Sequence, residues 1–406
     1  MENIKTRRWL YLLTAIIVLL FMGIGYAFSL FVIPIEKDLG FLRTQTSMAF
    51  SLCFISFALG SFTGGFIIQK VKPQSLMKIV AMTLSFGFIA TTFVTHAWQL
   101  YFTYSMCCGF SIGVIYNVCV SVIPLYFQDK IGFATGVLLM GYAMSTTIFG
   151  QICEYGVTIL SWQGVFRILG VSMFAILMIA SFIIHFPSSR EINTLPKSNK
   201  TAIESIDYTP VELVKSKTFY IFISIYILLG GIGMSIINHT VPALREDFLL
   251  TTTFTAAIFS AISLFNGLGR VVWGILFDKT GASFIYRSLG GLVSIALLLM
   301  VFSFHFQNWL SFAVGGACVM FCFGGSSSLA PILVRYLYGD QYFSMNFSIT
   351  NIGTLILSTT PMFIGSIQMR YDQYFPSFVV LLFFGILALL ASLLYKPIAS
   401  RELQKY

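Results

Sequence analysis

Charge is scarce in this chain of 406 residues, of which 10% are charged and 57% are hydrophobic. Soluble domains carry about 25% charged residues, so this composition cannot cover a surface that faces water. The 24 Lys and Arg against 15 Asp and Glu leave a formal net charge of +9. The positive residues lie between apolar runs and follow membrane topology, so we expect no nucleic-acid partner.

Motifs of enzymes and of metal sites are also missing. The sequence has no Walker glycine loop ending in Gly-Lys-Ser/Thr, which argues against ATP-driven transport. It has no cluster of His, Cys and carboxylates that would hold a metal or activate a nucleophile. All seven cysteines fall inside apolar runs, where a disulfide framework is not expected. We therefore predict no enzyme activity, no metal and no cofactor.

Long apolar runs are abundant and do not alternate with a period of two, which excludes a β-barrel and favours membrane-spanning helices. Twelve such runs lie near residues 9–33, 43–69, 76–95, 98–126, 132–158, 164–186, 218–241, 251–277, 284–304, 308–334, 344–368 and 374–396. The first is too long for a signal-peptide core and has no small-residue cleavage site. We expect it to be retained as the first helix.

The runs form two sets of six, which predicts an all-α membrane protein of twelve transmembrane helices in two pseudo-symmetric bundles. We expect the bundles at 1–186 and 218–406, with a cytoplasmic linker at 187–217 that is rich in proline and charge. An internal repeat supports this division. Gly23, Gly25, Pro34 and Asp38 recur 208 residues later as Gly231, Gly233, Pro242 and Glu246, and Gly65 and Lys70 recur after 209 residues as Gly274 and Lys279.

The distribution of Lys and Arg predicts the orientation. With a cytoplasmic N-terminus, 18 of these residues lie on the inner side, five lie on the outer side and one, Arg270, lies within a span. The positive-inside rule then places both termini in the cytoplasm. We expect a multi-pass protein of the cell membrane that functions as a monomer in the lipid bilayer.

A loop motif follows the eighth predicted helix as Gly274-x-x-x-Asp278-Lys279-x-Gly281. Glycine allows close helix approach and tight turns, and an aspartate at a helix end can meet cationic groups. We interpret the motif as a conformational latch, although an ordinary helix end and turn would look the same. The copy after the second helix keeps Gly65 and Lys70 but has lost the acidic residue.

With two six-helix halves, a central linker and this repeated loop, the sequence resembles the major facilitator superfamily over nearly its whole length. More specific patterns are Gly109-x-x-x-Gly113-x-x-Tyr116-Asn117, Tyr126-Phe127-x-Asp129-Lys130-x-Gly132, Trp162-x-x-x-Phe166 and Asn266-x-x-x-Arg270. They are similar to the oxalate/formate antiporter branch and its monocarboxylate-porter relatives.

Arg270 is the one basic residue deep within a span. It precedes Asp278 by eight residues, about 12 Å along a helix, so we expect it near the middle of a hydrocarbon layer about 30 Å thick. Arginine there is costly and faces a cavity or a partner. The resemblance implies that it binds a substrate carboxylate. A structural arginine held by Asn266, water and carbonyls is the alternative.

Other pocket residues come from the same resemblance. The oxalate carriers that the chain resembles have a second cation, a lysine, at the position of Thr354, and no Lys or Arg occurs between Arg335 and Arg370. One positive charge favours a monocarboxylate over a dicarboxylate. Ser327 replaces an aromatic residue of those carriers, which predicts a larger pocket. The expected substrate contacts are Arg270, Asn266, Tyr26, Tyr116, Tyr142, Phe323, Ser327 and Thr354.

Coupling to an ion has weaker candidates. Glu154 is the one acidic residue within an apolar span and could instead pair with Arg167 across a short loop. His239 has a side chain suited to proton transfer, but a single interfacial histidine is usually inert.

We thus expect a secondary transporter of a small organic anion, working by alternating access, with proton symport and anion exchange both open. An efflux carrier for hydrophobic or drug-like compounds on the same fold is one alternative. A transport-inactive membrane sensor is the other.

Overall fold

The computed structural model describes residues 4–196 and 207–394, and in these residues it contains helices and turns but no strand. Eleven segments of the described chain are long and apolar enough to cross a membrane. The first predicted helix is not among these eleven, because it is divided into α1 (Ile4–Met22), the 3₁₀ segment η1 (Gly23–Phe28) and α2 (Ser29–Leu39). Taken together, these three segments form the twelfth membrane helix. The predicted all-α fold class with twelve membrane helices is confirmed.

Two compact units make up the chain. Unit 1 contains residues 4–196 and the first part of α14, Phe343–Asn351, while unit 2 contains 207–342 and 352–394. Two short helices, α8 (Ser189–Thr194) and α9 (Pro210–Lys215), lie in the stretch expected to be a linker. The limits 1–186, 187–217 and 218–406 stay predictions, because the compact units group residues that contact one another and do not separate the bundles from a linker.

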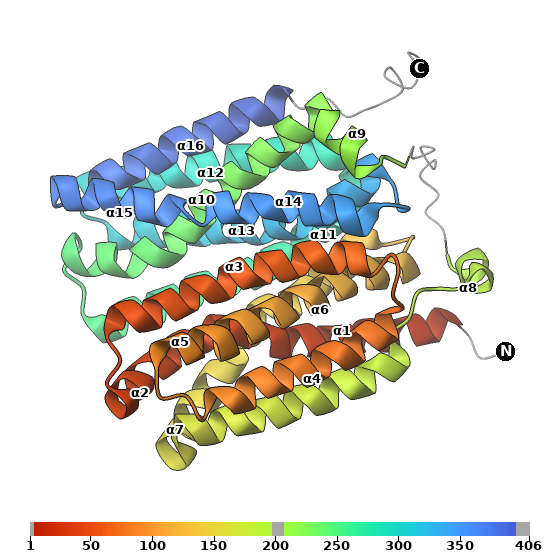
Figure 1. Cartoon of the computed structure of the whole chain (residues 1–406). Helices are drawn as coiled ribbons and strands as arrows, with labels where there is room; N and C mark the ends of the chain where they lie inside the picture. The colour runs from red at the N-terminus through yellow and green to blue at the C-terminus, as the bar shows by residue number, and fades with distance from the viewer. Residues whose placement is uncertain (1–3, 197–206, 395–406) are drawn as a thin grey trace. The chain divides into compact units, whose positions relative to one another are not determined.

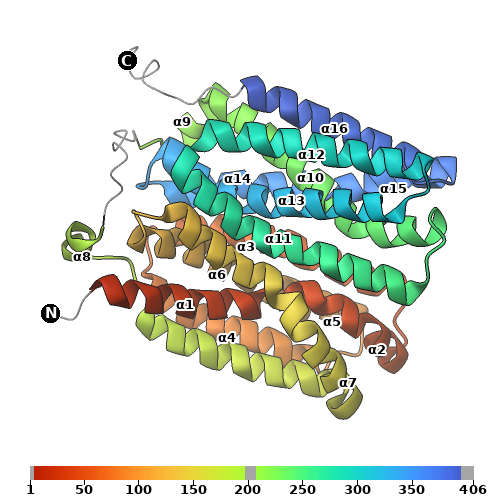
Figure 2. The ribbon, with the colours of Figure 1, turned by 180° about the vertical axis from the view of Figure 1, so that it is seen from behind.

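Unit 1 consists of the first six predicted helices. After α1, η1 and α2 come α3 (Arg43–Ile67), α4 (Pro73–Thr91), α5 (Ala97–Leu100), the π-helical η2 (Tyr101–Cys108), α6 (Gly109–Val122), the 3₁₀ segment η3 (Ile123–Tyr126) and α7 (Ile131–Ile183). Helix α7 packs on both α1 and α4, and these three lie side by side in both views (Figures 1 and 2). Helix α3 packs on α6.

The long helices from α10 onward lie in unit 2, except for the first part of α14, Phe343–Asn351, which belongs to unit 1. They are α10 (Lys217–Glu246), α11 (Thr252–Thr280), α12 (Ala282–His305), α13 (Trp309–Tyr338), α14 (Phe343–Leu357), α15 (Thr360–Tyr371) and α16 (Phe375–Leu394). Helix α11 packs on α13, and α12 packs on both α13 and α16 (Figure 2).

Glycines allow one close helix crossing in each unit. In unit 1 a Cβ atom at Gly60 would overlap the carbonyl of Phe110, and one at Gly113 would overlap the carbonyl of Phe57. Unit 2 repeats the arrangement, with Gly269 against the carbonyl of Phe321 and Gly324 against that of Asn266. Only glycine permits such close backbone contact. The internal repeat is therefore visible in the packing of α3 on α6 and of α11 on α13.

Helix interruptions have local causes. Helix α7 joins two predicted helices across Ser161, whose φ of 64° and ψ of 168° are non-helical. The eleventh predicted helix, 344–368, is two helices, because α14 ends at Leu357 and α15 begins at Thr360. Pro361 follows the break; a proline lacks an N–H group and clashes with the carbonyl four residues earlier, which here belongs to Leu357.

A buried ion pair anchors the start of unit 1. The Arg8 guanidinium donates to both carboxylate oxygens of Asp129, with distances of 2.5 and 3.2 Å, and lies 4.8 Å from the ring centre of Phe127. Arg8 is 7% exposed. A two-point contact between guanidinium and carboxylate is a strong arrangement for buried charge, so we assign this arginine to structure.

Candidate functional site

Arg270 lies in the middle of α11 and is 8% exposed, so the structure places this charge inside unit 2. Its Nε donates to the Oδ1 atom of Asn266 over 3.5 Å, and its backbone carbonyl accepts from the Ser328 hydroxyl at 3.2 Å. Asn266 and Arg270 are thus neighbours on one helix face, as their spacing predicts. The long amide contact orients the guanidinium and is compatible with both a binding and a structural role.

Tyr226 is a site residue that sequence reasoning missed. It lies in α10, and its hydroxyl is 3.1 Å from that of Thr354 in α14. The charge of Arg270 also acts electrostatically on the Tyr226 hydroxyl. The Asn266 amide thus contacts the Arg270 guanidinium, and the Tyr226 hydroxyl, which is paired with Thr354, lies within reach of its charge. The sequence offered little signal, since Tyr226 is one of 19 tyrosines and its partner lies 128 residues away.

Phe323 and Ser327 both lie in α13, one helical turn apart. The Phe323 ring packs so closely on Gly233 of α10 that any Cβ atom there would overlap it. The Ser327 hydroxyl donates to the Phe323 carbonyl at 2.9 Å. Phe323 therefore fixes the contact between α10 and α13, while the small Ser327 satisfies its own polar group within the helix.

The tyrosines expected in unit 1 belong to an aromatic cluster. The ring centres of Tyr116 and Tyr142 are 5.3 Å apart, and those of Phe57 and Tyr116 are 5.4 Å apart. Phe347 lies in the part of α14 that belongs to unit 1, and its ring centre is 6.3 Å from that of Tyr116. Tyr26 lies in η1, and its side chain falls outside the described residues. No finding tests the substrate contacts, which stay predictions.

The latch residues lie at helix ends in both units. Gly274, Asp278 and Lys279 occupy the last turns of α11, and Gly281 follows with a φ of 84°, which favours glycine. In unit 1 a Cβ atom at Gly65 would overlap the Ser348 hydroxyl and the Ser344 carbonyl. Lys70 is exposed just after α3. Gly65 thus permits a close approach and Gly281 a turn, while close approach at Gly274 and latching stay predictions.

The two coupling candidates differ in what the structure describes. His239 of α10 lies with its Nε2 atom 2.9 Å from the carbonyl of Pro361, next to the break between α14 and α15. The side chain of Glu154 lies outside the described residues. Arg167, its suggested partner, donates to the Thr92 hydroxyl at 3.3 Å and lies 5.4 Å from the Phe93 ring centre. A role in coupling stays untested for both.

Comparison with known proteins identifies the family. Residues 13–358 match the model of the Major Facilitator Superfamily, so the chain belongs to that superfamily of multi-pass membrane transporters. It is 25% identical over 347 residues to the oxalate:formate antiporter of Oxalobacter formigenes, covering 84% of this chain and 80% of that protein. It is 22% identical to monocarboxylate transporter 6 of Mus musculus over 163 residues, 40% of this chain and 35% of that protein.

Solved structures agree on the fold. The proton:xylose symporter XylE superposes with a TM-score of 0.74 at 12% identity, and the match covers 95% of each chain. At that identity the likeness shows the architecture alone. The predicted superfamily and the resemblance to oxalate/formate and monocarboxylate carriers are confirmed.

Proposed function

We propose that this chain moves a small monocarboxylate across the membrane by alternating access, with the carboxylate bound to Arg270. The observation that carries the proposal is the buried guanidinium of Arg270 beside the Asn266 amide, near the hydroxyl pair of Tyr226 and Thr354. A planar guanidinium can donate two parallel hydrogen bonds to a carboxylate. Charge within a membrane segment is usually kept for such a purpose.

The preference for one carboxylate group rests on the chemistry around Arg270. Thr354 and Tyr226 supply hydroxyls, which can donate to a substrate oxygen but add no positive charge. A second carboxylate would have to lose its hydration without gaining an opposite charge, and that loss is costly. The likeness to an oxalate:formate antiporter and to a monocarboxylate transporter supports small carboxylates as substrates.

Tyr226 would position the substrate through its hydroxyl. The Tyr226 and Thr354 oxygens are 3.1 Å apart, so one donates to the other and the second proton is available to a ligand. We propose Tyr226 together with Arg270, Asn266 and Thr354 as the polar part of the site. Tyr26, Tyr116, Tyr142, Phe323 and Ser327 are retained as proposed contacts with the rest of the substrate.

The test is uptake of radiolabelled lactate, pyruvate, formate and oxalate by proteoliposomes that hold the purified protein. We expect uptake of at least one monocarboxylate, with oxalate carried more slowly. Arg270→Gln should lower uptake at least about 30-fold, since truncating a buried charged partner costs about 2–5 kcal/mol. Tyr226→Phe should lower it about five- to tenfold, as expected for one hydrogen bond.

Controls separate binding from folding. Arg245 is an exposed arginine in the last turn of α10, and Arg245→Gln should leave uptake unchanged. Thermal unfolding of each variant in detergent checks that the fold is kept. Wild-type uptake by Arg270→Gln, or transport of hydrophobic cations instead of carboxylates, would overturn the proposal and favour an efflux carrier.

The coupling mode is measured in the same vesicles. An inward proton gradient that drives accumulation of the monocarboxylate indicates symport. Acceleration by unlabelled carboxylate inside the vesicle, without a gradient, indicates exchange. Either result fits a site in which Arg270 supplies the positive charge, because a proton and a counter-anion both balance one negative charge.

A further inference from the structure

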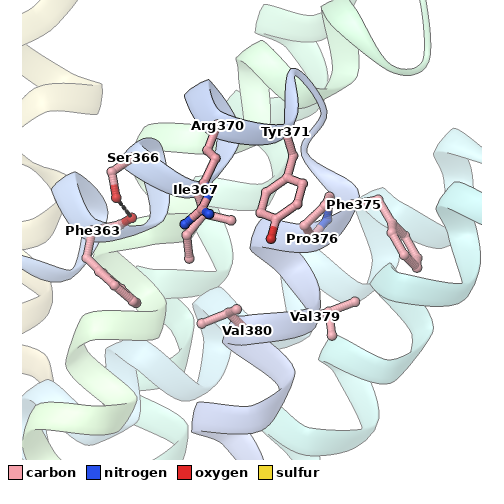
Figure 3. A pocket seen from close by; sticks show the side chains of 9 residues that line it. All are labelled: Phe363, Ser366, Ile367, Arg370, Tyr371, Phe375, Pro376, Val379 and Val380. Atoms are coloured by element: carbon pink, nitrogen blue, oxygen red, sulfur yellow. Dashed lines mark hydrogen bonds between the residues drawn. The ribbon is translucent and has the colours of Figure 1, made fainter.

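An open groove of about 600 Å³ lies between α15 and α16 of unit 2, within the 300–1,000 Å³ range of ligand sites (Figure 3). Its walls are mainly apolar, with Phe363 and Ile367 from α15 and Val379 and Val380 from α16. Arg370 and Tyr371, in the last turn of α15, extend toward α16 (Figure 3). The groove therefore combines a long apolar wall with a cation at one end.

The charge of Arg370 has little compensation in the described part of the chain. Its guanidinium lies 6.0 Å from the centre of the Tyr371 ring, and no described residue forms an ion pair with it. Asp372 is exposed after the end of α15, and its backbone N–H group donates to the carbonyl of Gln368. A guanidinium beside an apolar groove attracts a ligand that is anionic at one end and apolar along its length.

We propose that this groove is a binding site for one glycerophospholipid, with its phosphodiester on Arg370 and an acyl chain along Phe363, Val379 and Val380. Arg370 is among the five cations predicted at the outer membrane boundary, where lipid phosphates lie. Phe363 precedes it by seven residues, about 10.5 Å deeper along the helix, where acyl chains lie. The order of polar and apolar groups in the groove thus matches that of a phospholipid.

This site is separate from the transport chemistry around Arg270, since the residues that line the groove belong to α15 and α16. A phospholipid wedged there would brace α15 against α16 from the side. Its binding is therefore measured directly and does not depend on the identity of the transported substrate.

The experiment is native mass spectrometry of the delipidated full chain, titrated with phosphatidylglycerol and, in parallel, with phosphatidylethanolamine and inorganic phosphate. We expect one phospholipid to bind more tightly than the rest. Arg370→Gln should weaken that first binding about tenfold. Val379→Trp, which fills the groove at an exposed wall position, should weaken it by a similar factor. Arg245→Gln removes an exposed arginine outside the groove and should change nothing.

Three outcomes would overturn the proposal. Equal lipid binding by Arg370→Gln and Arg245→Gln would mean a non-specific lipid shell. Binding of inorganic phosphate that depends on Arg370 but not on Val379→Trp would mean a free-anion site. A dimer that Val379→Trp abolishes, without a change in lipid binding, would mean that the groove is a contact between two copies of the chain. Thermal unfolding of both groove variants verifies that they remain folded.

Discussion

The two units have the same helix crossing but different side chains around it. Gly60 and Gly113 bring α3 and α6 together in unit 1, and Gly269 and Gly324 do the same for α11 and α13 in unit 2. Gly269 is Gly60 shifted by 209 residues, the offset that also relates Gly65 to Gly274. The backbone framework was therefore retained in both units.

The hydrogen bonds at the crossing are equivalent too, but the side chains are not. In unit 1 the Asn117 amide donates to the carbonyl of Ser61 at 3.1 Å, and in unit 2 the Ser328 hydroxyl donates to the carbonyl of Arg270 at 3.2 Å. Ser61 and Arg270 thus occupy equivalent positions, 209 residues apart. The buried charge is a substitution on a repeated scaffold. Packing alone did not require it, because unit 1 forms the crossing with serine.

Exchanging these two residues should give the largest effects. Arg270→Ser makes unit 2 resemble unit 1, so we expect a folded protein whose monocarboxylate uptake falls at least about 30-fold. Ser61→Arg places a charge at a position that is 0% exposed and should prevent recovery of folded protein, because burying an unpaired ion costs several kcal/mol. Uptake and thermal unfolding measure both. Normal stability of Ser61→Arg would contradict this prediction and would show that position 61 accommodates a guanidinium as position 270 does.

Overpacking the crossing should destabilise both units equally. Gly113→Val and Gly324→Val each push a side chain against backbone carbonyls, and we expect a loss of about 1–3 kcal/mol in the free energy of unfolding. Gly291 in α12 is the matched control, since a Cβ atom there meets nothing within 4 Å. Denaturation followed by fluorescence would measure the change. A clear difference between the two valine variants would limit the symmetry to the backbone.

The hydrogen bonds at the crossing should differ in strength. Asn117 also donates to the Ser348 hydroxyl and accepts from Ser121, each at 3.1 Å, so Asn117→Ala leaves several buried groups without their partner and should cost about 2–3 kcal/mol. The Ser328 hydroxyl also lies 3.0 Å from the Gly325 carbonyl, and Ser328→Ala should cost about 0.5–1.5 kcal/mol. Equal losses in chemical denaturation would contradict this ranking.

A smaller effect on stability is expected at the aspartates near the C-terminal ends of α2 and α10. Asp38 accepts from the Trp162 indole at 3.0 Å, and Asp247 accepts from the Tyr374 backbone at 3.1 Å. Burial raises the pKa of Asp247 above its ordinary value. The folded state therefore binds this proton more tightly than the unfolded state, and ionisation of Asp247 costs stability that is regained as pH falls through the raised pKa.

Asp247→Asn removes that charge and measures its cost. As pH rises from about 4 to 7, the free energy of unfolding of the variant should increase relative to that of the wild type. The expected gain is less than about 1 kcal/mol, because the carboxylate is partly exposed. Unfolding curves at several pH values provide the test. A pH-independent difference would assign the effect to the hydrogen bond with Tyr374 instead.

Much of the fold was predictable because membrane helices leave strong local signals. Apolar run length located the helices, and the recurrence of Gly23, Pro34 and Gly65 in the second half revealed the repeat. Arg270 was identifiable because a charge in an apolar run is unusual. The interruption between α14 and α15 was not predicted, because the run 344–368 stays apolar through Pro361. In the structure the proline is associated with the end of α14 at Leu357.

The candidate site was predictable in part. Asn266 and Arg270 share one helix face by spacing alone, and the structure brings them into contact. Tyr226 was not distinguishable from other tyrosines, because its pairing with Thr354 depends on how α10 and α14 pack. The structure also groups the first part of α14, Phe343–Asn351, with unit 1, which the apolar run by itself does not indicate.

The sequence by itself determined the membrane class, the superfamily, the repeat and the buried cation, since hydropathy, spacing and charge are properties of neighbouring residues. Only the tertiary structure decided that Tyr226 pairs with Thr354, which carbonyls the glycines meet, and where a cationic groove opens between α15 and α16. Those features join residues from different helices, and the crossing of two helices depends on side-chain packing that no local pattern records.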